Sequence, residues 1–108
     1  MSKKPARPRE AARRDVEAAI DYYNSEADID VAFGFIDALQ TTYRSIADHP
    51  ALGSPRYANE LGLSGLRTRI LRRYPYLVFY VERDDHIDIW RVLHAHRDIP
   101  VWMQEPES

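Results

Sequence analysis

Four arginines lie within seven residues in the second half of the chain: Arg67, Arg69, Arg72 and Arg73. A guanidinium binds carboxylates and phosphates through paired N–H groups, so this set could hold an anionic partner. The same residues could also form a solvated strand edge that discourages pairing between sheets. Because the net charge of the chain is −2 and the group is small, we do not expect direct, sequence-specific binding of nucleic acid.

His94 and His96 are the second candidate for chemistry. On a strand, the H-x-H spacing places both imidazoles on one face, as some metal sites require. A third ligand is not evident, because His86 and Asp88 lie at the far end of the same predicted strand. We therefore predict no metal site. A side chain that titrates near neutral pH, with an arginine to stabilise a phosphorane, could instead support RNA cleavage.

Aromatic side chains with a polar N–H are common anchors at interfaces, and the chain has two tryptophans. We count Trp90 among the candidate contact residues, whereas Trp102 could equally fill the edge of the core beside the first helix. Arg97 follows the two histidines and adds a cation to that end of the chain. The candidate set for binding a partner is therefore Arg67, Arg69, Arg73, Trp90, His94, His96 and Arg97.

The composition excludes several kinds of chemistry. The 108-residue chain has no cysteine, which rules out disulfides, thiolate nucleophiles, iron–sulfur clusters and cysteine-based zinc sites. Apolar residues are 44% of the chain, too many for a disordered protein, and the length fits one domain, residues 1–108. The longest apolar run, Tyr76 to Val81, is far too short to span a membrane, and the basic N-terminus lacks the apolar stretch of a signal peptide. We expect no cofactor and no membrane contact.

Steps of three and four between apolar residues predict two helices in residues 8–48. Pro8 can begin the first helix, because its missing N–H is not needed in the first turn. Asp28 or Asp30 can cap the second helix, and His49-Pro50 ends it. The short link between them makes the pair an antiparallel helical hairpin. Residues 1–7 are polar, and we expect a flexible arm or a short edge strand there.

The second half of the chain changes its pattern. Residues 49–65 are rich in proline and glycine and predict a loop with one helical turn near Ala58. The period of the apolar residues then becomes two, which predicts antiparallel strands within residues 66–96. We expect residues 97–108 to form a C-terminal turn and tail. The predicted fold class is α+β, with the N-terminal αα-hairpin packed on one face of a small antiparallel sheet.

A layer of two helices can cover only one face of such a sheet, so the alternation of side chains assigns each strand residue to a covered or an open face. The side chains predicted to face the helices are Leu66, Thr68, Ile70, Ile87, Ile89 and Leu93. Those predicted for the open face are Arg67, Arg69, Arg73, Trp90, Val92, His94 and His96. Arg91 falls on the apolar face by this count, and two explanations stay open: a bulge that re-aims it, or a side chain that reaches out to solvent.

Several segments, taken together, match a known pattern. In the second half they are Gly65-Leu66-Arg67, "YPYLVFY" at residues 74–80, "IDIWRVLH" at residues 87–94 and Arg97-Asp98-Ile99-Pro100. With the helix-starting "AARRDV" and the His49-Pro50 of the first half, residues 8–103 resemble the ParE branch of the RelE/ParE toxin superfamily. Members of that branch usually begin with an apolar first strand, whereas residues 1–7 of this chain are polar.

The resemblance implies the toxin of a bacterial type II toxin–antitoxin system that acts in the cytoplasm. Its partner would be a ParD-like antitoxin whose C-terminal segment wraps the toxin. Its target would be DNA gyrase, whose inhibition blocks replication. An acidic segment of the antitoxin would suit the arginine set, because opposite charges favour the correct partner.

RelE-type relatives instead cleave mRNA in the ribosome, and the resemblance leaves that activity as the alternative function. Those nucleases carry a catalytic aromatic hydroxyl or related groups near the C-terminus. Here no tyrosine follows Tyr80, and the residues after His96 offer only Arg97, Asp98, Trp102 and acids. We therefore predict a toxin that binds its target, is not an enzyme and has no catalytic residue. In the alternative, His94 or His96 would act as the acid or base.

Overall fold

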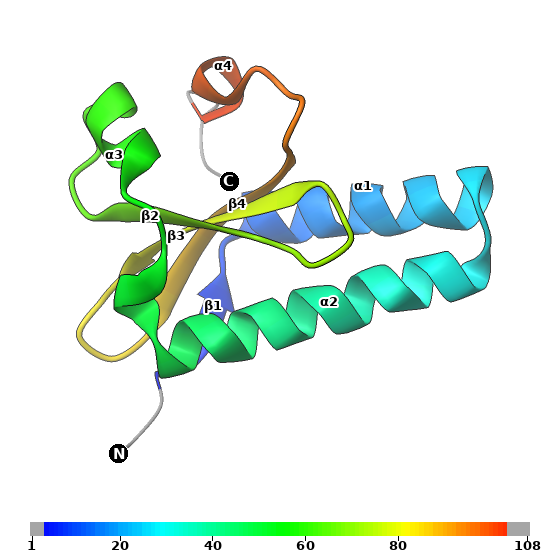
Figure 1. Ribbon diagram of the computed structural model, residues 1–108, viewed down its shortest axis with the longest axis horizontal. Coiled ribbons are helices and arrows are strands. Elements are labelled where there is room, and N and C mark those ends of the chain that lie inside the picture. Colours follow the sequence, from blue (N-terminus) through cyan, green and yellow to red (C-terminus); the bar gives the residue numbers. More distant parts are fainter. Residues whose placement is uncertain (1–3, 104–108) are drawn as a thin grey trace.

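A three-residue strand opens the described part of the chain, residues 4–103 of the computed structural model, and two long helices follow it (Figure 1). These first elements are β1 (Ala6–Pro8), α1 (Glu10–Glu26) and α2 (Ile29–Asp48). The second half contains a short 3-10 turn, η1 (Pro50–Leu52), then α3 (Arg56–Leu61), β2 (Leu66–Ile70), β3 (Tyr76–Glu82), β4 (Ile87–His94) and α4 (Ile99–Met103). None of these helices is long and apolar enough to cross a membrane.

The helical hairpin follows the signals in the sequence closely. The side chain of Asp28 accepts a hydrogen bond from the Val31 N–H at 3.0 Å and so caps α2, as predicted. This helix ends two residues before Pro50, because the residue preceding a proline avoids helical geometry. The first helix begins only at Glu10, since Pro8 belongs to β1 and not to the first helical turn.

The four strands form one sheet in the order β1-β4-β3-β2. The last three strands pair antiparallel, as predicted, but β1 runs parallel to β4, so the sheet is mixed. The prediction of a purely antiparallel sheet fails at this edge because β1 and β4 are far apart in sequence. The helical hairpin and two strands lie between them, which is more than enough chain for a parallel crossover. The Arg9 N–H donates to the Ile89 carbonyl at 2.9 Å and closes this pair.

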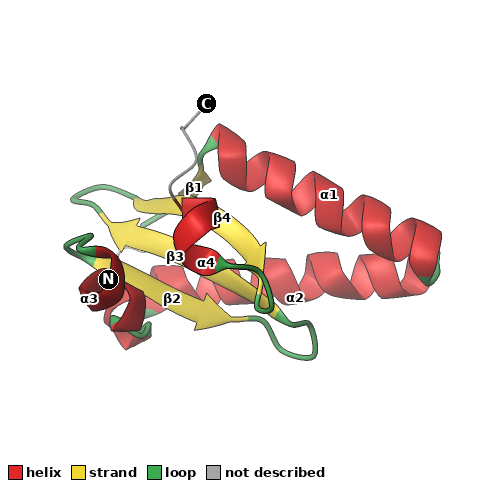
Figure 2. Cartoon of the chain, turned by 90° about the horizontal axis from the view of Figure 1, so that it is seen from above, coloured by secondary structure: helices red, strands yellow, loops and turns green. Residues whose placement is uncertain are grey.

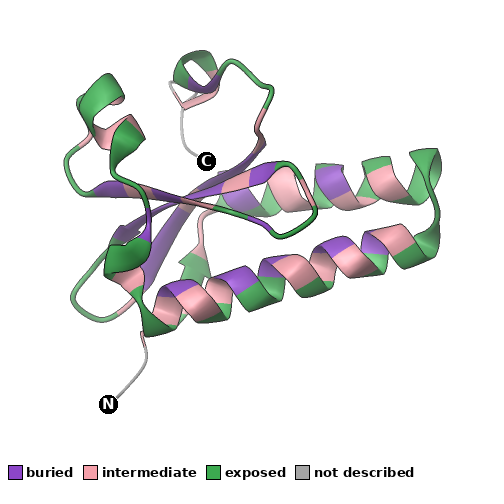
Figure 3. Ribbon diagram, in the orientation of Figure 1, coloured by how far each residue is buried: buried purple, intermediate pink, exposed green. Residues whose placement is uncertain are grey.

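Both faces of the sheet are covered. The long helices α1 and α2 lie along one face, while the short helices α3 and α4 stand on the other (Figures 1 and 2). The core on the hairpin side includes the fully buried Phe35 and Tyr80, and the opposite core includes Phe79, with Trp102 packed against it. Figure 3 shows that burial concentrates on the strands and on the sides of α1 and α2 that face them. Two cores explain why the run that forms β3 is apolar on both faces.

The strand β2 faces the opposite way from the prediction. Leu66 packs in the core on the side of α3, and Thr68 lies on that face too, opposite Phe79. Arg67 and Arg69 instead point toward the loop after α2 and toward α2 itself. The prediction for β2 was wrong because it allowed only one covered face. Since α3 and α4 cover the second face, Leu66 and Thr68 are buried there, whereas Ile70 at the end of β2 stays exposed.

A bulge in β4 changes the facing of its second half. Trp90 is the extra residue, since the neighbours Phe79 and Tyr80 of β3 pair with Arg91 and Ile89. Each residue after the bulge therefore lies on the face opposite to the one predicted by simple alternation. This shift reverses the predicted facing of Arg91, Val92, Leu93 and His94. Of the two explanations left open for Arg91, the bulge is the correct one.

Candidate functional site

A groove of about 370 Å³ lies where α1, the end of β4 and α4 meet, and we call it the C-terminal groove. Aromatic rings and charged side chains share its lining, which includes Asp15, Tyr22, Tyr76, His94, Arg97 and Trp102. Two of the predicted contact residues, His94 and Arg97, therefore line one groove. The ring of His96 lies against that of His94, with 5.2 Å between the ring centres. The groove therefore brings His94, His96 and Arg97 to one end of the molecule.

An ion pair between Asp15 of α1 and Arg91 of β4 fixes the walls of this groove. The Nε and Nη2 groups of Arg91 donate to the two carboxylate oxygens of Asp15, each at 2.7 Å. Arg91 Nη1 also donates to the Trp102 carbonyl at 2.9 Å, and the Val92 N–H donates to Asp15 Oδ2 at 3.0 Å. Both charged side chains are nearly buried, with 10% and 11% of their area exposed. The pair thus joins α1, the bulge of β4 and α4.

His94 lies at one end of the C-terminal groove, and its surroundings determine its protonation state. Its ring meets the ring of Tyr76 edge-on, with 5.1 Å between centres. Burial, and then the charges of His96 and Arg97, lower the pKa of His94, so the imidazole is neutral at neutral pH. Its Nδ1 accepts the His96 N–H at 3.1 Å, which assigns the ring proton to Nε2. The remaining ring nitrogen is therefore a hydrogen-bond donor and not a base.

Arg97 and Trp102 form the opposite wall. The guanidinium of Arg97 lies over the Trp102 ring at 4.1 Å from its centre, a cation–π contact. Arg97 is exposed, whereas Trp102 is half-buried and packs on the core beneath α4. The groove therefore presents an exposed cation on an aromatic plane. Such a surface suits a carboxylate or the polar rim of another protein.

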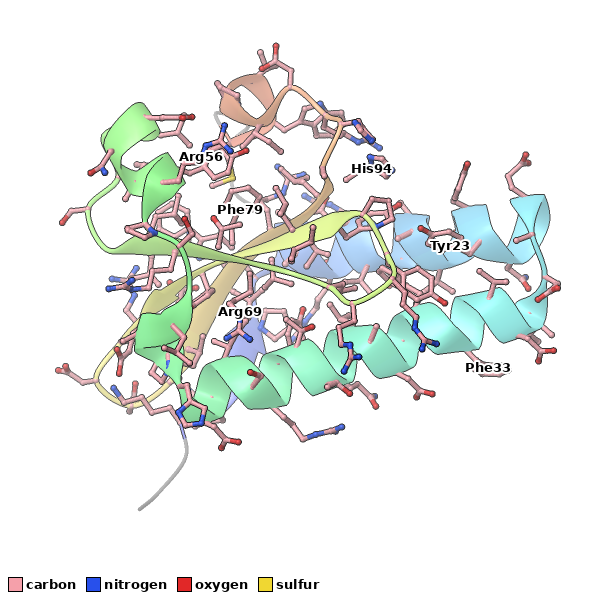
Figure 4. The ribbon with its side chains drawn as sticks, viewed as in Figure 1. Tyr23, Phe33, Arg56, Arg69, Phe79 and His94 are labelled. Carbon is pink, nitrogen blue, oxygen red and sulfur yellow. The ribbon has the colours of Figure 1, made fainter. Side chains whose placement is uncertain are left out.

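Arg67 and Arg69 do not belong to this groove. Arg67 Nη1 donates to the Gly53 carbonyl at 2.8 Å, and Arg69 Nη2 donates to Ser45 Oγ at 2.9 Å. Both side chains are half-buried and link β2 to α2 and to the loop that follows it. Figure 4 shows Arg69 beside α2, apart from His94. Their predicted place, on an open face together with the histidines, was wrong because β2 turns these residues toward the hairpin.

Trp90 lies in a charged network at the edge formed by β1 and β4. Its Nε1 donates to Asp88 Oδ2 at 3.1 Å, and the guanidinium of Arg9 lies over its ring at 4.4 Å. Asp88 also accepts hydrogen bonds from Arg9 and Arg83, at distances from 2.8 to 3.2 Å. Burial raises the pKa of Asp88, but the hydrogen bonds from Arg9 and Arg83 outweigh burial and leave it below its ordinary value. The network ties β1 to its neighbour.

The predicted contact residues thus fall into three places. Arg73 is exposed in the connection between β2 and β3, and with Arg67 and Arg69 it belongs to the side of the sheet next to α2. Trp90 lies at the β1–β4 edge, and the remaining residues lie at the C-terminal groove. Within residues 4–103, no group of three or more His, Asp or Glu side chains lies close enough together to hold a metal ion.

Sequence reasoning missed Asp15 and Tyr22. Asp15 looked like one of eight acids in residues 15–48, and Tyr22 lies outside the apolar stripe of its helix. A signal for Asp15 was nevertheless present, because Arg91 is a lone cation in an apolar strand. A buried arginine requires an acidic partner, and the helix packed on that strand is the place to search for one.

Comparison with known proteins assigns this arrangement to a family. A family model described as the ParE toxin of the type II toxin–antitoxin system parDE matches residues 7–99, a range that includes both long helices and strands β2 to β4. Among solved structures, the chain is similar to one described as the chromosomal ParDE TA system from P. aeruginosa. The two share a TM-score of 0.72 and 18% identity, over 87% of this chain and 98% of that one. No curated protein shows a significant match. The chain therefore belongs to the ParE toxin family of type II toxin–antitoxin systems.

Proposed function

We propose that this ParE-family toxin inhibits DNA gyrase and that a ParD-like antitoxin neutralises it. The observation that carries the proposal is the extent of the family match, residues 7–99, which covers the helical hairpin, the main strands and most of the C-terminal groove. The similar structure from P. aeruginosa is described as a ParDE system, which supports the choice of partner. The proposed place of action is the cytoplasm, where the chromosomal DNA lies.

The chemistry of the C-terminal groove supports binding and not bond cleavage. The Nδ1 of His94 is occupied by a backbone N–H, and the carboxylate of Asp15 is occupied by Arg91. Neither group is available to remove a proton from a substrate hydroxyl, which is what acid–base cleavage of RNA requires. The groove instead offers Arg97 on Trp102 and the exposed ring of Tyr22. Arginine and large aromatic residues are typical anchors of protein interfaces.

A supercoiling assay with purified gyrase tests the proposal. We expect the toxin to inhibit supercoiling and to trap cleaved DNA. Prior mixing with the antitoxin encoded in the adjoining reading frame should abolish both effects. If a large molar excess of folded toxin leaves gyrase unaffected, the proposed target is wrong. If the toxin inhibits gyrase and the antitoxin binds it without restoring supercoiling, the proposed neutralisation is wrong.

Ribosome-dependent cleavage of mRNA is the second candidate function. The observation that favours it is the meeting of His94, His96 and Arg97 at one groove, since an imidazole and a guanidinium can together serve phosphodiester cleavage. Primer extension on a translated mRNA, with and without toxin, would show new ends at codons in the ribosomal A site. In this function the His94→Ala and His96→Ala changes should abolish the cuts. We expect no cuts with either the wild-type toxin or the variants.

A further inference from the structure

A second groove lies between α2 and the turn that connects β2 to β3, and we call it the α2 groove. Its volume is about 440 Å³, and its lining includes Gly34, Asp37, Thr41, Arg72, Arg73 and Tyr74. Two arginines thus form one wall, while the hydroxyl and small residues of α2 form the other. None of these six residues was assigned a role in the C-terminal groove.

The two arginines of this wall differ from the other two arginines of the set. Arg67 and Arg69 donate to groups of the protein itself, as described above. Arg72 and Arg73 are exposed, and within residues 4–103 neither side chain makes a hydrogen bond, an ion pair or a cation–π contact. In addition, Nη1 of Arg69 is buried and has no hydrogen-bond partner among the described residues. The guanidinium donors of Arg72 and Arg73 are therefore unused among the described residues, whereas the buried Nη1 of Arg69 is not accessible to a partner.

The backbone presents Arg73 in an unusual conformation. Its φ angle is +68°, and it is the one residue other than glycine with positive φ in residues 4–103. A side chain in this left-handed region costs about 1–2 kcal/mol, and the natural choice at such a position is glycine or asparagine. Strained backbone clusters at functional sites, which makes Arg73 a candidate for binding. Arg72 and Arg73 of this turn both line the groove.

The floor of the α2 groove is rigid. The Tyr74 hydroxyl donates to the Val31 carbonyl at 2.9 Å and lies directly over Gly34, where a Cβ atom would collide with it. The Tyr74 ring also packs edge-on against the rings of Tyr23 and Phe35, with centres 5.3 and 5.6 Å away. A rigid floor below two unpaired cations lowers the entropy lost when a partner binds.

We propose that the α2 groove binds an acidic peptide segment of the antitoxin, with carboxylates paired to Arg72 and Arg73. This inference rests on the proposed function, because it names the surface that the antitoxin uses. Carboxylates match the planar donor pairs of guanidinium groups. The floor of Gly34 and Tyr74 accommodates the backbone and small side chains between the acidic residues.

Nucleic acid fits this groove less well, because α2, which lines it, is acidic. Residues 28–48 contain four aspartates and one arginine, and Asp37 lines the groove itself. A nucleic-acid strand carries a charge at every phosphate and would pass beside these carboxylates. A peptide can pair its few acids with the arginines and leave neutral residues next to Asp37. The charge pattern therefore favours a peptide.

The test measures the affinity of full-length toxin for the purified antitoxin encoded by the adjoining reading frame. We expect Arg72→Glu together with Arg73→Glu to weaken binding by about 10- to 100-fold and to reduce its dependence on salt. The matched control reverses two other exposed arginines, Arg7→Glu with Arg13→Glu, and should bind like the wild type. Because both pairs are exposed, thermal melting should show that all variants fold.

The outcomes separate this inference from the proposed function. If wild-type toxin does not bind the antitoxin, the proposed partner is wrong. If it binds and the Arg72, Arg73 variant binds equally well, the partner stands and the α2 groove is not its site. A labelled single-stranded DNA serves as a second probe. If the binding of DNA depends on these arginines and the binding of the antitoxin does not, the inference is also overturned. Restored affinity with an antitoxin that carries Arg in place of an acidic residue would confirm the pairing.

Discussion

Replacing Asp15 with alanine should destabilise the protein strongly, because it removes the carboxylate that is paired with the buried Arg91. Arg91 has only 8% of its area exposed, and it donates two charge-assisted hydrogen bonds to Asp15 and one to the Trp102 carbonyl. The Val92 N–H loses its acceptor as well. Removing one partner of a buried pair typically costs about 3–5 kcal/mol of unfolding free energy. For a domain of this size that loss lowers Tm by at least about 12 °C.

Urea unfolding followed by circular dichroism at neutral pH measures this effect. The Asp15→Ala variant is compared with Arg91→Leu and with the double variant, which removes both charges. We expect the double variant to be more stable than either single one, since no unpaired charge remains. Asp21→Ala, an exposed change on the same helix, is the matched control and should shift stability by less than about 0.5 kcal/mol. A loss below about 1 kcal/mol for Asp15→Ala would refute the role given to the pair.

Three further predictions concern stability. Gly34→Ala should cost about 1–3 kcal/mol, because its methyl group meets the Tyr74 hydroxyl that donates to Val31, and a Tyr74→Phe background should reduce that cost in urea unfolding. Arg73→Gly should raise stability by about 0.5 kcal/mol, since glycine accepts a φ of +68° without strain; a lower Tm would contradict the strain. Burial and neighbouring cations lower the pKa of His94 in the folded state. As pH falls, the imidazole is therefore protonated at a higher pH in the unfolded chain than in the folded one, and the free energy of unfolding decreases below about pH 6.5. His94→Gln should flatten that slope of unfolding free energy against pH, and an unchanged slope would contradict it.

The helical hairpin could be predicted from the sequence because its signals are local. The apolar stripes repeat at helical spacing, Asp28 caps α2, and Pro50 ends it. The three long strands were equally clear, since alternation and a run of aromatic and branched residues depend on short stretches of sequence. The parallel pairing of β1 is different. It joins Ala6 to Ile87 across almost the whole chain, and no local pattern records that contact.

The site was harder to predict because it depends on which face each strand buries. A shift of one residue moves every side chain to the other face, and the bulge at Trp90 makes such a shift within β4. No glycine marks this bulge, so its main signal was the misplaced Arg91. The covering of the second face by α3 and α4 reversed Arg67 and Arg69 for a similar reason. The residue types were identified correctly, but their grouping required the tertiary structure.

The supercoiling activity of gyrase in the presence of the His94→Ala, His96→Ala double variant tests the central claim most directly. If the toxin acts by binding its target and breaks no bond, this variant should still inhibit supercoiling, as the wild type does. Neither should cut a translated mRNA in a parallel reaction. The claim would be contradicted if the wild-type toxin cuts mRNA and does not inhibit gyrase, while the double variant does not cut mRNA.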